Sequence, residues 1–143
     1  MTPPPRLVPE LYCRNFRRSL QVYTQIFGFS LLHERAGFAL LDLGGERVML
    51  EALGPDAWRI VPAVQSGCGV HLDMMVEALA PLLERAKRAG LAAFRQPEEA
   101  WYRLGGAFTG QRHAVFSDPD GHRLRFSEPL GRRSVAPGGR VLA

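Results

Sequence analysis

The spacing of hydrophobic and polar positions changes along the chain in an order that occurs twice. The first half opens with an apolar stretch at 6–13 and then shows a helical spacing of apolar residues from Asn15 to Gly28. Asn is a good N-cap and Gly a good helix terminator. Alternating or short apolar runs follow, at 29–35, 38–43 and 46–53. The pattern predicts a strand, a helix and three strands.

The second half repeats this order. An apolar stretch at 69–75 precedes a helical pattern at 78–89, which carries Pro81 in its first turn and is closed by Gly90. Further extended segments follow at 91–95, 101–104, 112–117 and 122–127. Gly28 and Gly90 are 62 residues apart, as are the valines that open the two halves, Val8 and Val70. The spacing indicates an internal duplication.

We therefore expect an α+β fold of two βαβββ modules, in which the helices lie outside and two curled mixed sheets enclose a trough. The expected boundaries are a flexible lead at 1–5, a first module at 6–53, a linker at 54–67, a second module at 68–130 and a flexible tail at 131–143.

The end of the second module contains the most distinctive motif. The turn Asp118-Pro119-Asp120-Gly121 has Pro and Gly where a chain reversal needs them. In the strand behind it, Leu124 and Phe126 fall on one face, whereas Arg123, Arg125 and Ser127 fall on the other. One face suits a core, and the other suits polar contacts around Arg125.

Composition narrows the classes of function. The 143 residues are 46% hydrophobic with a formal charge of +4, and Arg132, Arg133 and Arg140 near the end carry most of that excess. We therefore expect neither nucleic-acid binding nor, without a long apolar run or an N-terminal leader pattern, a membrane protein. The default location is cytoplasmic, with Cys13 and Cys68 as reduced thiols.

Several motifs together resemble the vicinal oxygen chelate superfamily, which includes glyoxalase I, extradiol dioxygenases and the fosfomycin- and bleomycin-resistance proteins. The resemblance covers residues 7–128, with 101–103 and 110–112 most similar to the bleomycin-resistance branch. Its motifs are Val8-Pro9-Glu10-Leu11, Ser19-Leu20-Gln21-Val22-Tyr23, Phe27-Gly28-Phe29, Gly44-Gly45, Met49-Leu50-Glu51, Asp118-Pro119-Asp120-Gly121 and Leu124-Arg125-Phe126.

The resemblance also implies positions for metal ligands on the first, fourth, fifth and eighth strands. These positions fall at Val8, Glu51, His71 and Arg125. Glu51 and His71 could bind a divalent metal, but valine has no donor atom and a guanidinium repels a cation. Glu10 or Glu128 could substitute only through a shift in strand register. The metal set is incomplete, so we expect no cofactor.

Five residues are candidates for contacts with a ligand: Glu51, His71, Trp101, Tyr102 and Arg125. Alternatives remain open for each. Glu51 and Arg125 could form a structural ion pair, contact a ligand or be unrelated. His71 could be a structural residue, and the two aromatic residues could pack a hairpin or a dimer contact.

The resemblance implies a homodimeric protein that sequesters a small molecule without transforming it and without a metal. An anionic or neutral aromatic ligand suits Arg125 better than a cationic drug does. The alternative is a divalent-metal-dependent glyoxalase-like lyase, isomerase or thiol transferase that uses Glu51, His71 and one unrecognised ligand. A third possibility is a scaffold with a collapsed pocket and an interaction role.

Overall fold

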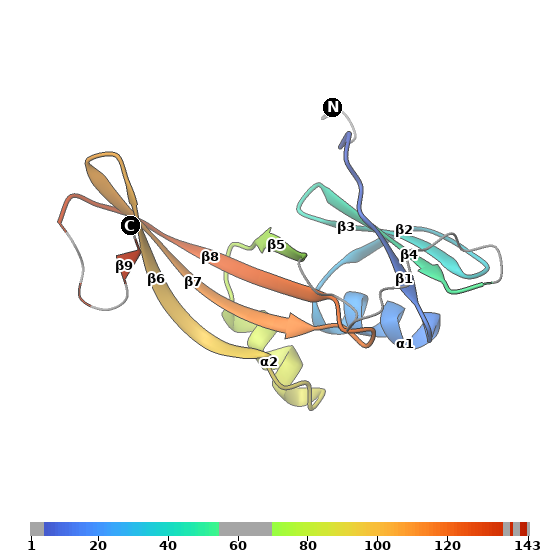
Figure 1. The fold of residues 1–143 in the computed structure, drawn as a ribbon. Helices are drawn as coiled ribbons and strands as arrows, with labels where there is room; N and C mark the ends of the chain where they lie inside the picture. The colour runs from blue at the N-terminus through green and yellow to red at the C-terminus, as the bar shows by residue number, and fades with distance from the viewer. Residues whose placement is uncertain (1–4, 55–69, 136–137, 139–140, 143) are drawn as a thin grey trace. The chain divides into compact units, whose positions relative to one another are not determined.

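The computed structural model describes residues 5–54, 70–135, 138 and 141–142, so most of the predicted linker at 54–67 lies outside the described residues (Figure 1). The chain forms two compact units. Unit 1 contains the described residues up to 54 together with Asp118–His122. Unit 2 contains Val70–Ser117 and the described residues from Arg123 onward.

The sheet of unit 1 has four strands. They are β1 (Glu10–Cys13), β2 (Ser30–Arg35), β3 (Phe38–Leu43) and β4 (Glu46–Ala52), in the order β1-β4-β3-β2. β1 lies parallel to β4, and the other pairs are antiparallel. The first strand is shorter than predicted because Pro9 has no N–H to give to a neighbour; its carbonyl still accepts from Met49 at 2.8 Å.

The helix of unit 1 begins as predicted and then widens. Asn15 caps α1 (Phe16–Gln21) by accepting a hydrogen bond from the Arg18 N–H at 3.1 Å. The chain continues as a π-helix, η1 (Val22–Ile26), and Gly28 ends it with a φ of 88°. The wider turn belongs to the best-buried part of unit 1, where the rings of Tyr23 and Phe27 pack edge to face with centroids 5.3 Å apart.

Unit 2 repeats the architecture. It comprises β5 (His71–Met75), α2 (Ala80–Arg88), β6 (Arg95–Leu104), β7 (Ala107–Ser117), β8 (Arg123–Arg133) and β9 (Val141–Leu142), with strand order β5-β8-β7-β6-β9. β5 is parallel to β8 as β1 is to β4. The repeated order confirms the predicted pair of βαβββ modules.

The hairpin of unit 2 is longer than the sequence indicated. The short segments predicted at 91–95 and 101–104 give way to one strand, β6, and the predicted flexible tail from 131 begins inside β8 and ends in β9, which pairs with β6. Two features extend the sheet. Trp101 lies directly over Gly110, where any Cβ would clash at 2.6 Å, and the guanidinium of Arg133 covers its ring at 4.7 Å.

Helix α2 is capped from another strand. Pro81 lies in its first turn, as predicted. The residue at the cap, Leu79, has no side-chain oxygen, so its N–H donates to Glu128 Oε2 of β8 at 2.7 Å. Glu128, the predicted substitute ligand, is therefore engaged in holding the helix.

The Asp118-Pro119-Asp120-Gly121 turn belongs to unit 1, although the strands on either side of it belong to unit 2. Asp118 is buried, and its Oδ2 accepts from the Tyr23 hydroxyl at 3.0 Å and bonds the His122 ring at 2.7 Å. Its other oxygen accepts from the Asp120 and His122 N–H groups at 2.9 and 2.8 Å. The turn assigned to the second module thus completes the first.

Asp120 makes the second attachment. Its Oδ1 accepts from the backbone N–H and the Nε of Arg14 at 3.0 and 3.2 Å, and its Oδ2 accepts from Ser19 at 3.3 Å. Both aspartates of the motif are therefore used by the segment around α1, which explains why a turn with two carboxylates is buried.

Within the described part of the chain, no helix is long and apolar enough to cross a membrane.

Candidate functional site

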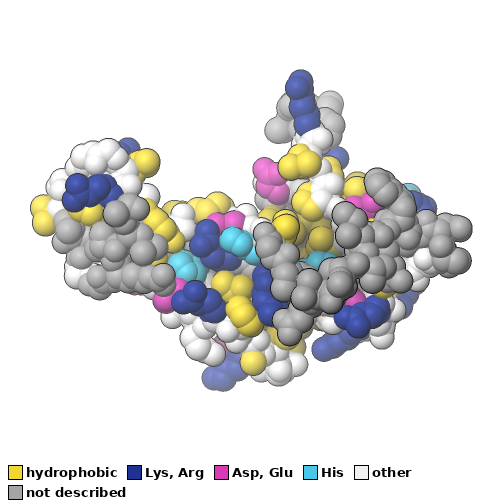
Figure 2. Space-filling view, in the orientation of Figure 1, with side chains coloured by type: hydrophobic (Ala, Val, Ile, Leu, Met, Phe, Trp, Pro, Cys, Tyr) yellow, Lys and Arg dark blue, Asp and Glu magenta, His cyan; other side chains and the backbone are white. Residues whose placement is uncertain are grey.

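The outward face of the unit 2 sheet carries a continuous set of polar side chains. Strand alternation puts Leu124 and Phe126 in the core, both with no exposed surface, and turns Arg125 and Ser127 to the opposite face. The register pairs Arg125 with Asp73 of β5 and Ser127 with His113 of β7. We call this set, with Glu98 of β6, the polar face: Asp73, Glu98, His113, Arg125 and Ser127. Figure 2 shows basic, acidic and histidine side chains side by side over the strands of unit 2.

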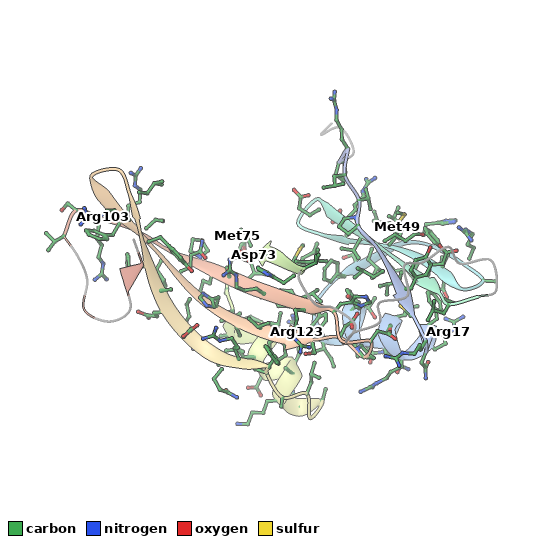
Figure 3. The ribbon with its side chains drawn as sticks, viewed as in Figure 1. Arg17, Met49, Asp73, Met75, Arg103 and Arg123 are labelled. Atoms are coloured by element: carbon green, nitrogen blue, oxygen red, sulfur yellow. The ribbon has the colours of Figure 1, made fainter. Side chains whose placement is uncertain are left out.

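Arg125 forms an ion pair with Asp73, and both side chains are about two-thirds buried. Ser127 donates to the other oxygen of Asp73 at 3.0 Å. Burial alone would raise the pKa of Asp73, but the hydrogen bonds from Arg125 and Ser127 outweigh it and lower that pKa. The same pair raises the pKa of Arg125. Figure 3 shows Asp73 and Met75 projecting from β5 beside β8.

His113 is the most buried member of the polar face, with 7% of its side chain exposed. Its Nε2 lies 3.2 Å from Glu98 Oε1, which also pairs with Arg95 at 3.3 Å. A carboxylate only accepts, so Nε2 carries a proton. The other ring nitrogen, Nδ1, is buried and has no hydrogen-bond partner among the described residues, and the same holds for Nε of Arg125.

The structure separates the two predicted aromatic contacts. The pKa of Arg125 is raised mainly by its hydrogen bond with Asp73. Tyr102 also lies close to Arg125, and its hydroxyl adds to this rise. Trp101 is only 3% exposed and packs over Gly110 on the other face of the hairpin. Trp101 therefore takes the alternative role of hairpin packing and offers little surface to a ligand.

Asp73 and His113 were missed in the sequence. His71, the predicted residue of β5, is exposed and pairs in register with Arg123, one row away from Arg125. The partner of Arg125 within its own unit is Asp73, two residues later. Alternation along 69–75 could have pointed to Asp73, because it lies on the same face as His71; the pairing of β5 with β8 joins segments 52 residues apart and has no local signal.

Unit 1 places two glutamates on its matching face. In unit 1, Glu10 of β1 pairs with Met49 of β4, and in unit 2, His71 of β5 pairs with Arg123 of β8. Glu51 and Arg125 each lie two residues beyond these partners on β4 and β8, so they occupy equivalent positions in the two units. Glu10 thus occupies in unit 1 the position that His71 has in unit 2. The resemblance implied Val8 for the first-strand position, whereas the residue of β1 that matches His71 in register is Glu10, two residues later.

The two glutamates interact. The pKa of Glu10 is raised by a hydrogen bond with Glu51, by burial and by the negative charge of Glu51. The positive charge of Arg35 opposes this rise. Like-charged carboxylates in contact hold a proton more tightly.

With this register, the four ligand positions that the resemblance implies would be Glu10, Glu51, His71 and Arg125. The last of these does not fit a metal, because a permanently charged guanidinium paired with Asp73 stands where a ligand is needed. Within the described ranges, no three His, Cys, Asp or Glu side chains lie close enough together to hold an ion.

Cys13 is fully buried at the end of β1. Burial raises the pKa of its thiol to about 11, so it is protonated at neutral pH and is a poor nucleophile. Cys68 lies outside the described residues.

The fold is shared with solved structures of low sequence identity. An integron cassette protein from the mobile metagenome of V. cholerae is 20% identical, with a TM-score of 0.64, over 90% of this chain and 97% of that one. TioX from Micromonospora sp. ML1 is 23% identical (TM-score 0.59), over 87% and 98% of the two chains. A lactoylglutathione lyase from Agrobacterium tumefaciens is 14% identical (TM-score 0.60), over 89% and 95%.

No curated protein matches the chain in sequence. The family model described as the Glyoxalase/Bleomycin resistance protein/Dioxygenase superfamily matches residues 7–126. That match spans both modules, from β1 to the middle of β8, and the two sheets have the repeated order described above. The chain belongs to the glyoxalase/bleomycin resistance protein/dioxygenase superfamily.

Proposed function

We propose that this protein binds and sequesters a small anionic, preferably aromatic, molecule on the polar face of unit 2, without transforming it and without a metal. One observation carries the proposal. Asp73 holds the Arg125 guanidinium in a fixed orientation, while the Nε of that guanidinium is buried and has no hydrogen-bond partner in the part of the chain that the structure describes.

A fixed guanidinium favours anions for a physical reason. Its donors lie in one plane and match the oxygens of a carboxylate, and orienting it beforehand lowers the entropic cost of binding. Tyr102 adds an aromatic surface beside it. The sequence of unit 2 also carries 11 Lys and Arg against six Asp and Glu, which disfavours a cationic ligand such as bleomycin.

The test compares aromatic carboxylates with their uncharged amides by thermal shift and by calorimetry. We expect the carboxylates to raise the melting temperature and the amides to have little effect. Arg125→Gln should weaken carboxylate binding at least tenfold, whereas Arg132→Gln, at the far end of β8, should not. Equal binding of the acid by wild type and Arg125→Gln would place the ligand elsewhere and refute the proposal.

A second candidate, a divalent-metal-dependent lyase, isomerase or thiol transferase, is favoured by the position of Glu10. Glu10 contacts Glu51 within unit 1, so a second carboxylate lies beside a ligand that the sequence identified. A bound divalent ion would act as a Lewis acid. Stoichiometric metal in protein purified without chelator, lost in both His71→Ala and Glu10→Gln, would favour this candidate over sequestration.

We also propose that the protein is a homodimer. Strand β2 forms an edge of its sheet, all six of its residues are exposed, and Leu31 and Leu32 are 44% and 49% exposed. An edge strand of this kind can pair with a second copy.

A further inference from the structure

The two unpartnered nitrogen atoms on the polar face require opposite hydrogen-bond partners. Arg125 Nε carries a hydrogen and can only donate. His113 donates through Nε2 to Glu98, so in the neutral imidazole its Nδ1 can only accept. Both atoms are buried, and a buried polar group without a partner costs free energy that binding a complementary group recovers.

These two side chains are neighbours on one face. His113 lies opposite Ser127, and Arg125 is two residues from Ser127 on the same strand, so His113 and Arg125 are diagonal cross-strand neighbours. Such pairs have separations of roughly 7–8 Å, within reach of long side chains. Ser127 lies between them and donates to Asp73, which in turn orients Arg125. One small ligand can therefore reach both groups.

We infer that the ligand is a hydroxy-carboxylate, with its carboxylate on Arg125 and its hydroxyl donating to His113 Nδ1. This inference rests on the proposed function and narrows it from anions in general to anions with an adjacent hydroxyl group. A carboxylate alone satisfies Arg125 but leaves the His113 acceptor unpartnered. An alcohol alone can satisfy the histidine but forgoes the charge of the guanidinium.

Both nitrogen atoms are buried, so ligand contact requires side-chain rotation. Met75 ends the cross-strand row that contains Ser127 and His113, and 55% of its surface is exposed. Its unbranched side chain can change rotamer at low cost. The strands themselves need not move.

The matched probes are mandelate and phenylacetate, which differ by one hydroxyl group next to the carboxylate. We expect wild-type protein to bind mandelate about 3- to 10-fold more tightly in calorimetry, as one additional hydrogen bond predicts. His113→Gln keeps a group near the position of Nε2 and removes the acceptor at Nδ1, so the ratio of the two affinities should fall to about one. His113→Asn keeps a carbonyl oxygen near the Nδ1 position and should retain the preference.

The wild-type comparison alone decides the inference if a variant fails to fold. Equal affinity for the two probes overturns it, as does a preference that survives in His113→Gln. If both probes bind equally and both depend on Arg125, the hydroxyl-specific inference fails and the proposed anion binding stands. If neither probe binds, this inference is overturned, and the proposed function depends on the comparison of aromatic acids with amides.

Discussion

Unit 1 and unit 2 share the order of their first four strands and a parallel pairing of the first strand with the fourth, yet their outward faces carry different chemistry at matched positions. Glu10 and Glu51 in unit 1 correspond to His71 and Arg125 in unit 2. Contact with Glu51 raises the pKa of Glu10, whereas the arginine is paired with Asp73. The same backbone arrangement thus carries different charged side chains in the two units. These side chains decide whether a face attracts cations or anions.

The two units also differ in how they are completed. Unit 1 takes in the turn at 118–122, whose aspartates bond Tyr23, Arg14 and Ser19. Unit 2 uses Glu128 of its own β8 to cap α2. Unit 1 leaves β2 as an edge strand, whereas the matching strand of unit 2, β6, is covered by β9. The comparison predicts different consequences for mutations in each unit.

The largest expected effect is on the turn that unit 1 takes in. Asp118→Ala removes a carboxylate that accepts hydrogen bonds from the Tyr23 hydroxyl, the His122 ring and two backbone N–H groups. All four groups lose this acceptor. We expect the free energy of unfolding to fall by about 3–5 kcal/mol, measured by urea denaturation. Asp42→Ala is the matched control, because Asp42 accepts from Gly45 at an exposed turn, and it should cost about 1 kcal/mol. Equal losses in the two variants would refute the buried network.

The second prediction makes the outward face of unit 2 resemble that of unit 1. Arg125→Glu puts a carboxylate beside Asp73, so the pKa of Asp73 should move from below its usual value to above it, followed by NMR titration. Binding of aromatic carboxylates should fall at least tenfold, with a loss of stability of about 1 kcal/mol because the pair is partly exposed. Arg132→Glu is the control. An unchanged Asp73 titration would mean that the ion pair does not form in solution.

The third prediction concerns pH and the turn. A hydrogen bond with Asp118 raises the pKa of His122 in the folded protein above its unfolded value of about 6.5. The protonated ring therefore stabilises the fold fully below the unfolded pKa, and this contribution is lost as the pH rises through the higher folded pKa. We expect the difference in unfolding free energy between wild type and His122→Asn to shrink from pH 5.5 to pH 8.5. A difference that grows with pH would reverse the sign of the coupling.

The smallest expected effect is at the edge strands. Leu31→Lys places a charge on β2 and should lower the dimer fraction in sedimentation velocity, without a large loss of stability, because Leu31 is 44% exposed. Leu104→Lys, at the exposed end of β6 in unit 2, is the control and should leave the dimer unchanged. If the wild-type protein is a monomer, the proposal that β2 forms a dimer contact is refuted.

Local patterns predicted most of the backbone and little of the contacts. Asn15 and Gly28 bound the first helical segment as their cap preferences predict, but nothing at 22–26 indicates a π-helix, because its packing depends on Tyr23 and its distant partner. Alternation alone predicted that Arg125 lies on the polar face, opposite Leu124 and Phe126. Its partner Asp73 depends on a parallel pairing between distant segments, so the sequence suggested Glu51 instead.

A two-residue difference in register changed the interpretation of the metal positions. The motif pointed to Val8, and the pairing of β1 with β4 gives Glu10 the matching position. Alternation fixes which residues share a face but not how far along a neighbouring strand they lie, so register had to come from the structure.

The capture of 118–122 by unit 1 has a consequence for synthesis of the chain on the ribosome. The N-terminal sheet and α1 emerge early, but Tyr23, Ser19 and Arg14 find their carboxylate partners only when Asp118 and Asp120 leave the exit tunnel. Between those moments a helix surface built for two buried carboxylates is exposed. The first module is therefore synthesised first but completes its folding only after residues 118–122 have been made. Chains truncated before residue 118 should be sensitive to proteolysis, even though they contain every strand of that module.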